Sequence, residues 1–239
     1  MAILHDTTMS PGKLDLLSSW LPAQPWYAGR RPELARAGGF RLDDPGGEVG
    51  IEFMIVTDGS GEQVTSYLVP MTYRASALAS AIGALIGTAE HGVLGHRFIY
   101  DGVHDPVLIA QLVALIQGDT QAQAQRVSNT TDPTVTSQPV ADGPVTVAEA
   151  VVAAGDRSGT ELRIQTAGPD GARNGQMHLR VCRILRPGED PATPGGSAPA
   201  GGAARAGAAL ADGAGRPCVS TAWRLPDGTQ VRGTLVTAR

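Results

Sequence analysis

The chain is poor in lysine and in aromatic residues. The first shortage limits the catalytic chemistry that the protein can perform, and the second limits the composition of its core. It has 239 residues, of which 19 are basic, yet Lys13 is the only lysine. Lysine is the usual phosphate-holding and Schiff-base-forming side chain of enzymes, so its scarcity disfavours both kinds of catalysis. Aromatic residues make up 4% of the chain, so the core must consist mainly of Val, Leu, Ile and Ala.

Long apolar segments are missing as well. The longest candidate, residues 107–116, is too short to cross a bilayer, and the N-terminal residues lack the basic and apolar stretches of a secretory signal. We therefore expect a cytoplasmic protein without a membrane partner. In that reducing compartment Cys182 and Cys218 are expected to be buried thiols rather than a disulfide. The net charge of −4 argues against a nucleic-acid partner.

No group of residues has the spacing of a metal site or a catalytic site. Of the five histidines, His91 and His96 lie nearest to each other in sequence, and their spacing does not match a zinc site. His104 and Asp105 resemble an acid–base pair, but Asp105 is better explained as the cap of a helix. We therefore expect no catalytic residue, no metal and no cofactor.

The first half of the chain has the pattern of two helices separated by strands. Leucines and Trp20 at helical spacing predict a helix over residues 11–21, with Ser10 as its N-cap. Asp105, Pro106 and Gly118 have the positions of N-cap, first residue and end of a second helix. Alternating β-branched and aromatic residues predict strands over 39–42, 48–57, 64–73 and 97–102, a hairpin turn over 58–61, and a short helix or loop over 77–88. This order predicts an α+β unit rather than a doubly wound α/β fold.

The second half predicts a separate β unit. Residues 128–144 are polar and interrupted by proline, which indicates a linker between a first unit at 1–127 and a second unit at 145–239. Residues 189–217 are almost entirely Gly, Ala, Pro and Ser, so we expect a flexible loop there. Strands are predicted over 145–153, 160–166, 177–185, 220–225 and 230–237, mostly antiparallel, with a turn over 226–229.

Residues 20–30, Trp-Leu-Pro-Ala-Gln-Pro-Trp-Tyr-Ala-Gly-Arg, resemble the N-terminal cap signature of the actinobacterial maltokinases. In that signature a leucine is followed by Gln-Arg-Trp-Phe, a small residue, Gly and Lys. Here Pro25, Tyr27 and Arg30 replace the Arg, the Phe and the Lys.

Two further segments, 67–73 and 100–106, resemble parts of the same cap and occur in the same order. Together the cap-like segments span residues 10–118. The resemblance implies a cystatin-like cap, in which a curved antiparallel sheet is packed with helices.

Residues 179–194 resemble the maltokinase segment around the strand lysine that holds the nucleotide phosphates. Arg180 stands at the lysine position, and Pro194 stands where a glutamate on the following helix would position that lysine. The closing hairpin, 221–236, resembles the last strands of a kinase N-lobe. The resemblance therefore implies a degenerate N-lobe without nucleotide-binding residues and without the catalytic lobe.

These features favour a non-catalytic accessory or interaction protein linked to maltose, trehalose or glucan metabolism. Two alternatives remain open: a subunit of an ATP-dependent sugar kinase whose catalytic lobe is a separate chain, and a carbohydrate-binding module. Trp26 and Tyr27 are either sugar contacts or packing anchors between the first helix and the sheet.

The resemblance also implies an interface, because the second unit lacks the helix and the lobe that cover a kinase N-lobe. Apolar side chains on its strands are expected to face either the cap or another chain, in a homodimer or with a different protein partner. The candidates are Val181, Ile184, Trp223 and Val236.

Overall fold

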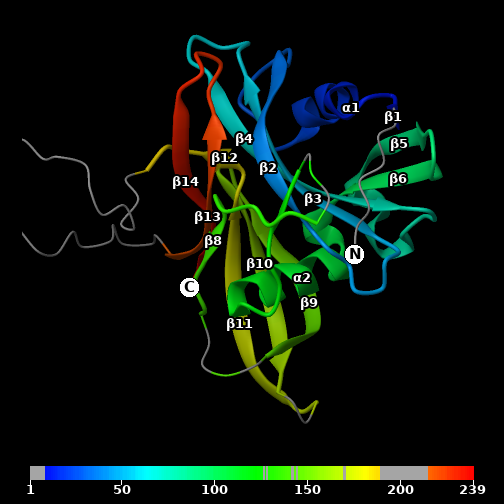
Figure 1. The fold of residues 1–239 in the computed structure, drawn as a ribbon, viewed down its shortest axis with the longest axis vertical. Coiled ribbons are helices and arrows are strands. Elements are labelled where there is room, and N and C mark those ends of the chain that lie inside the picture. The colour runs from blue at the N-terminus through cyan, green and yellow to red at the C-terminus, as the bar shows by residue number, and fades with distance from the viewer. Residues whose placement is uncertain are drawn as a thin grey trace, which may run out of the picture.

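The structure, a computed structural model, describes residues 9–125, 127, 129–140, 143, 145–168, 171–188 and 215–239. These residues form an α+β fold built on one open, antiparallel sheet (Figure 1). The main path of the sheet runs in the order β1-β5-β6-β4-β3-β2-β13-β14-β11-β10-β9, and three short strands, β12, β7 and β8, pair with β4, β2 and β13. Strands from both halves of the sequence therefore belong to the same sheet.

The first unit contributes both α-helices of the described residues. Its long strands lie within one or two residues of the predicted ranges, except β2, which begins five residues earlier than predicted. Its elements are β1 (Met9–Ser10), α1 (Lys13–Trp20), a 3₁₀ turn (Leu21–Ala23), β2 (Leu34–Leu42), β3 (Gly50–Asp58), β4 (Thr65–Arg74), a second 3₁₀ turn (Ala79–Ala84), β5 (Leu85–His91), β6 (Gly95–Asp101), a third 3₁₀ turn (Gly102–His104), α2 (Pro106–Gln117) and β7 (Gln123–Ala124).

The rest of the described chain is β structure. The stretch predicted as a linker contains a short strand that pairs with β13, so part of it lies on the sheet. The remaining elements are β8 (Thr136–Ser137), β9 (Thr146–Gly155), β10 (Gly159–Ala167), β11 (Arg173–Cys182), β12 (Ile184–Leu185), β13 (Arg216–Arg224) and β14 (Gln230–Ala238).

The second helix begins and ends as predicted, and the first does not. Asp105 caps α2, with its side chain accepting a hydrogen bond from the Val107 amide, and Gly118 ends the helix at a φ of 84°. By contrast, Gly12 and not Ser10 is the N-cap of α1, because Ser10 is paired with β5 in β1. Because Ser10 pairs with β5 in the sheet, the helix begins later than the sequence predicts.

The region predicted as a helix or loop is split between a 3₁₀ turn and the strand β5. Of the predicted loop at 189–217, residues 189–214 lie outside the described residues. Arg216 and Pro217 are not loop residues, because they begin β13 and pair with β14.

Each face of the sheet carries one helix. Residues on β3 alternate, with Phe53 and Ile55 in the core that contains α2 and Met54 and Val56 in the core that contains α1. This explains why β3 is buried along nearly its whole length.

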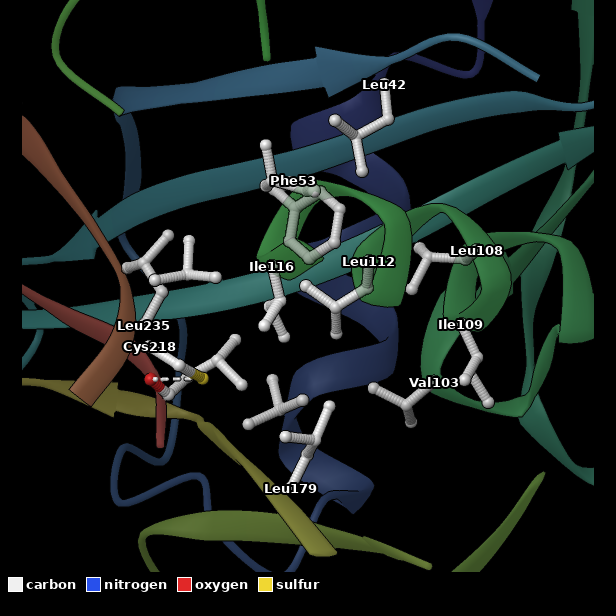
Figure 2. Packing of buried hydrophobic residues seen from close by; sticks show 14 of the residues in the cluster. Leu42, Phe53, Val103, Leu108, Ile109, Leu112, Ile116, Leu179, Cys218 and Leu235 are labelled. Carbon is white, nitrogen blue, oxygen red and sulfur yellow. Dashed lines mark hydrogen bonds between the residues drawn. The ribbon is translucent and has the colours of Figure 1, made fainter. Parts of the chain in front are cut away.

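The larger core joins the two halves of the sequence. Figure 2 shows side chains of α2, among them Leu112 and Ile116, between Phe53 of β3 and Leu179 of β11. Because one set of apolar side chains packs against both units, the sequence division at 128–144 does not separate two cores.

Candidate functional site

Arg180, at the position that corresponds to the kinase lysine, lies on β11 with its side chain 14% exposed. Its guanidinium donates to Asp156 Oδ1 at 2.6 Å and to Ser158 Oγ at 2.8 Å, and a further contact joins it to Glu161 Oε1. Glu161 is its direct cross-strand partner on β10. The arginine is thus held between two carboxylates.

The turn between β9 and β10, residues 155–159, packs against this arginine. Asp156 Oδ1 accepts hydrogen bonds from the backbone amides of Ser158 and Gly159, which fixes the shape of the turn. A Cβ on Gly159 would lie 2.7 Å from Arg180 Nε, so only glycine lets the guanidinium lie so close. Hydrogen bonding from Arg180 lowers the pKa of Asp156 below its ordinary value, so this carboxylate stays charged.

The electrostatics of this cluster do not suit a phosphate. Two carboxylates contact Arg180, and Arg239, 3.5 Å from Glu161, lies beside the same cluster. An arginine already paired with two carboxylates has little charge left for an anionic ligand.

The aromatic pair is placed for packing. Trp26 is 4% exposed, in edge contact with Trp20 and tilted against Tyr67. The Tyr27 hydroxyl donates to Asp58 Oδ2 at 2.6 Å. Partial burial, together with this bond to a carboxylate, raises the pKa of Tyr27. Trp26 therefore offers no open face on which a sugar could stack, whereas Tyr27 is half-buried and tilted against Tyr67.

The candidate interface residues are turned into the molecule. Val181, Trp223 and Val236 are at most 2% exposed and belong to the core shared by the two units. The Trp223 indole donates to Ser66 Oγ on β4 at 3.0 Å, and Ile184 pairs with Tyr67. Of the two arrangements that the sequence left open, the structure has the one in which these side chains face the first unit. Their expected exposure to another chain is therefore not found.

The other residues singled out in the sequence are dispersed. Cys218 is buried and Cys182 half-buried, both as free thiols, and burial raises the pKa of Cys218 to about 12. The Asp105 carboxylate binds Arg74 at 2.6 and 2.7 Å, so it is a helix cap and not the partner of His104.

In the described part of the chain no three His, Cys, Asp or Glu residues gather as metal ligands would. No helix there has the length and apolar character needed to cross a bilayer.

Comparison with known families bears on the first unit. Residues 20–105 match the model of the maltokinase N-terminal cap domain. This segment is maltokinase-cap-like, and we refer to it as the cap. The cap runs from the end of α1 to the residue before α2, and it contains Trp26, Tyr27 and the strands β2–β6. A search of the curated proteins finds no match to the chain.

Sequence reasoning missed two buried charged groups that the fold brings together. Arg183 and Asp101 form an ion pair at 2.6 Å between the second unit and the cap. Glu52, in the middle of β3, is 3% exposed and accepts hydrogen bonds from Lys13 at 2.5 Å and Tyr73 at 2.7 Å. The carboxylate of Glu52 within an apolar strand is the signal that could have revealed its cluster, since a buried charge needs a partner; Asp101, at the end of β6, gives no such signal.

Proposed function

We propose that this maltokinase-related protein is a non-catalytic accessory protein of maltose, trehalose or glucan metabolism. The observation that carries the proposal is the engagement of Arg180 by Asp156 and Glu161. In protein kinases a strand lysine pairs with nucleotide phosphates and with a glutamate, and this pair must be in place for phosphoryl transfer. Here the corresponding cation is neutralised by Glu161 of the neighbouring strand β10 and by Asp156 of the turn beside it.

A kinase subunit completed by a second chain is less well supported. A catalytic lobe supplied in trans would bring its own base and metal ligands, but the turn at 155–159 would still present Asp156 toward the phosphate position. Repulsion between that carboxylate and the phosphates opposes nucleotide binding. A carbohydrate-binding role is disfavoured by the burial of Trp26.

The proposal is tested with the purified full chain. Calorimetric titration with ATP and Mg²⁺ should give no binding, and incubation with ATP and maltose or glucosamine should give no sugar phosphate. The variant Arg180→Lys should stay inactive, because a lysine in the same place meets the same carboxylates. Phosphorylation that persists through further purification of the wild-type chain would refute a non-catalytic role.

A matched pair of variants tests why nucleotide does not bind. It distinguishes repulsion by the two carboxylates from the lack of a fold that can bind nucleotide. Asp156→Asn with Glu161→Gln removes the two negative charges and leaves the shape of the cluster. We expect nucleotide binding to be stronger in this double variant than in the wild type, and Asp227→Asn, on a distant turn, to have no effect. Equal, negligible binding in all three would show that the carboxylates are not what excludes the nucleotide.

A further inference from the structure

The two units meet in the sheet at a fork between β2 and β13. Among the described residues these strands are paired at one position, Gly38 with Trp223. In an unbroken antiparallel ladder the pairing would continue to Arg41 opposite Ser220, since the two residue numbers change in opposite directions. Instead, β2 pairs there with β7, and β13 pairs with β8. The two strands therefore separate beyond Gly38, and the segment that connects the units lies in the gap.

The backbone of β2 is irregular where the strands separate. Gly39, the first residue beyond the shared pair, has a φ of 125°, and a Cβ there would clash with the carbonyl oxygen of Phe53. The register of β2 against β3 also shifts between Arg36 and Gly38. Because glycine adopts a positive φ without strain, this position lets β2 change direction at the fork.

The segment in the fork is a small polar unit, which we name the wedge: residues 121–138, as far as they are described. It folds back on itself, because the Asp132 amide donates to the Ala122 carbonyl at 2.9 Å. Its contacts with the apolar core come from Ala122, which is buried, and from Val135, which is half-buried. The wedge can therefore leave the fork with the loss of little buried apolar area.

Arginine side chains from both units hold the wedge in place. From β2, Arg41 Nε donates to the Ala124 carbonyl at 3.2 Å. From β14, Arg232 donates to the Thr134 carbonyl at 2.5 Å and contacts the Thr136 hydroxyl. These groups are only partly buried, so water competes for the bonds and each contributes modestly to stability.

We propose that the wedge is a removable spacer, a conformational device built into the fold. In the structure it keeps β2 and β13 apart beyond their shared pair. When the wedge leaves, the freed backbone groups of the two strands find partners in each other, because the register set by Gly38 and Trp223 brings Arg41 opposite Ser220. The joint between the cap and the second unit then has two arrangements, one with the wedge in the fork and one with the wedge out.

Two pairs of introduced cysteines distinguish these arrangements. The wedge-out pair, Arg41→Cys with Ser220→Cys, forms a disulfide only when the wedge has left, since β7 and β8 otherwise lie beside these positions. The wedge-in pair, Arg41→Cys with Gln123→Cys, joins residues that are paired in the structure. We expect both bridges to form under mild oxidation of the folded protein, the wedge-in bridge first. Peptide mapping separates them from products of Cys182 and Cys218.

Removal of one arginine should favour release of the wedge. Arg232→Met, added to the wedge-out pair, removes the bonds to Thr134 and Thr136 and should speed formation of that bridge about tenfold. Arg224→Met is the matched control, because this arginine of β13 donates to the Gly228 carbonyl of its own hairpin, and it should leave the rate unchanged. A wedge-out bridge that does not form in the folded Arg232→Met protein overturns the proposal.

Hydrogen exchange of the unmodified chain tests the same release without any substitution, so the proposal stays testable if the cysteine variants do not fold. The Gln138 amide donates to the Cys218 carbonyl at 2.9 Å and reports the wedge, whereas amides shared by β13 and β14 report global unfolding. We expect the Gln138 amide to exchange through a smaller opening, with a weaker dependence on urea than the reference amides. The same urea dependence in both sets would overturn the proposal, since the wedge would then leave only when the whole protein unfolds.

Discussion

The single lysine of the chain holds a buried carboxylate. Lys13, on the first turn of α1, donates to Glu52 on β3, and its ammonium lies 5.2 Å from the ring centroid of Tyr73. Arg36 and Gln125 complete the ring of donors around Glu52. Lysine is scarce in this chain, yet its single lysine, Lys13, connects the first helix to the sheet through its hydrogen bond to Glu52.

Lys13→Met should therefore lower the free energy of unfolding by about 1–2 kcal/mol, since Glu52 keeps its other donors but loses a charged one. Urea denaturation followed by circular dichroism measures the change. Lys13→Arg, which can still donate to Glu52, is the control and should lose less. Equal stability of the methionine variant and the wild type would contradict a role for this pair.

The same carboxylate makes stability depend on pH. Burial by itself raises the pKa of Glu52, but the ammonium of Lys13 and hydrogen bonds from Lys13 and Tyr73 outweigh it and lower the pKa below 4.5. A carboxyl whose pKa is lower in the folded state adds stability above its unfolded pKa and loses it as the pH falls toward the folded value. We expect unfolding free energy to fall below about pH 4.5, with a shallower slope for Glu52→Gln. Parallel slopes in the two proteins would show that other acids account for the dependence.

At the scale of elements, both ends of α2 are set by capping residues. Asp105 is fully buried, caps the helix through the Val107 amide and binds Arg74 through both carboxylate oxygens. Gly118 ends the helix in the left-handed region, where a side chain is strained. These local signals fixed both ends of the helix from sequence alone.

Asp105→Ala should destabilise the protein by about 3–5 kcal/mol, because it removes the cap and leaves the Arg74 guanidinium without its carboxylate. Asp119→Ala, an exposed acid just beyond the same helix, should change stability by less than about 0.5 kcal/mol. Thermal unfolding of both variants measures the difference. A loss of similar size in the two would mean that the position of Asp105 in the helix is unimportant.

At the scale of the whole molecule, the cap and the second unit share one sheet and one core. Gly38 on β2 pairs with Trp223 on β13, and a Cβ on Gly38 would lie 3.2 Å from the Trp223 Cβ. The Arg183–Asp101 pair and the Trp223–Ser66 bond cross the same boundary. Separating the units would expose apolar surface and leave buried polar groups without partners.

The chain should therefore unfold in one cooperative transition. The three tryptophans report both parts, since Trp20 and Trp26 lie at or near the start of the cap and Trp223 in the second unit. Fluorescence of the wild type and of Trp223→Phe should give midpoints that coincide with those from far-ultraviolet circular dichroism of the same protein. Two separate transitions would show that the units fold independently.

Much of the fold and part of the candidate site could be predicted from the sequence. Strand alternation located β2–β4, β6, β10 and the β13–β14 hairpin to within a few residues, except that β2 and β13 begin several residues earlier than predicted. The cap signature around Trp26 marked the segment that the family model matches. Arg180 could be singled out because a substitution in a family motif is visible without a structure. Its engagement by Asp156 could not, since the turn shape and the register of β10 against β11 bring them together.

The sequence by itself determined the properties that depend on near neighbours along the chain: the caps of α2, the alternation of the strands, the hairpin turns and the α+β class. Only the tertiary structure decided whether Val181 and Trp223 face solvent or the cap, and which charges share the interior. The physical reason is distance along the chain. The pairing of β2 with β13 and of Asp101 with Arg183 depends on apolar area buried by residues far apart in sequence, and no local pattern records which strand will lie beside another.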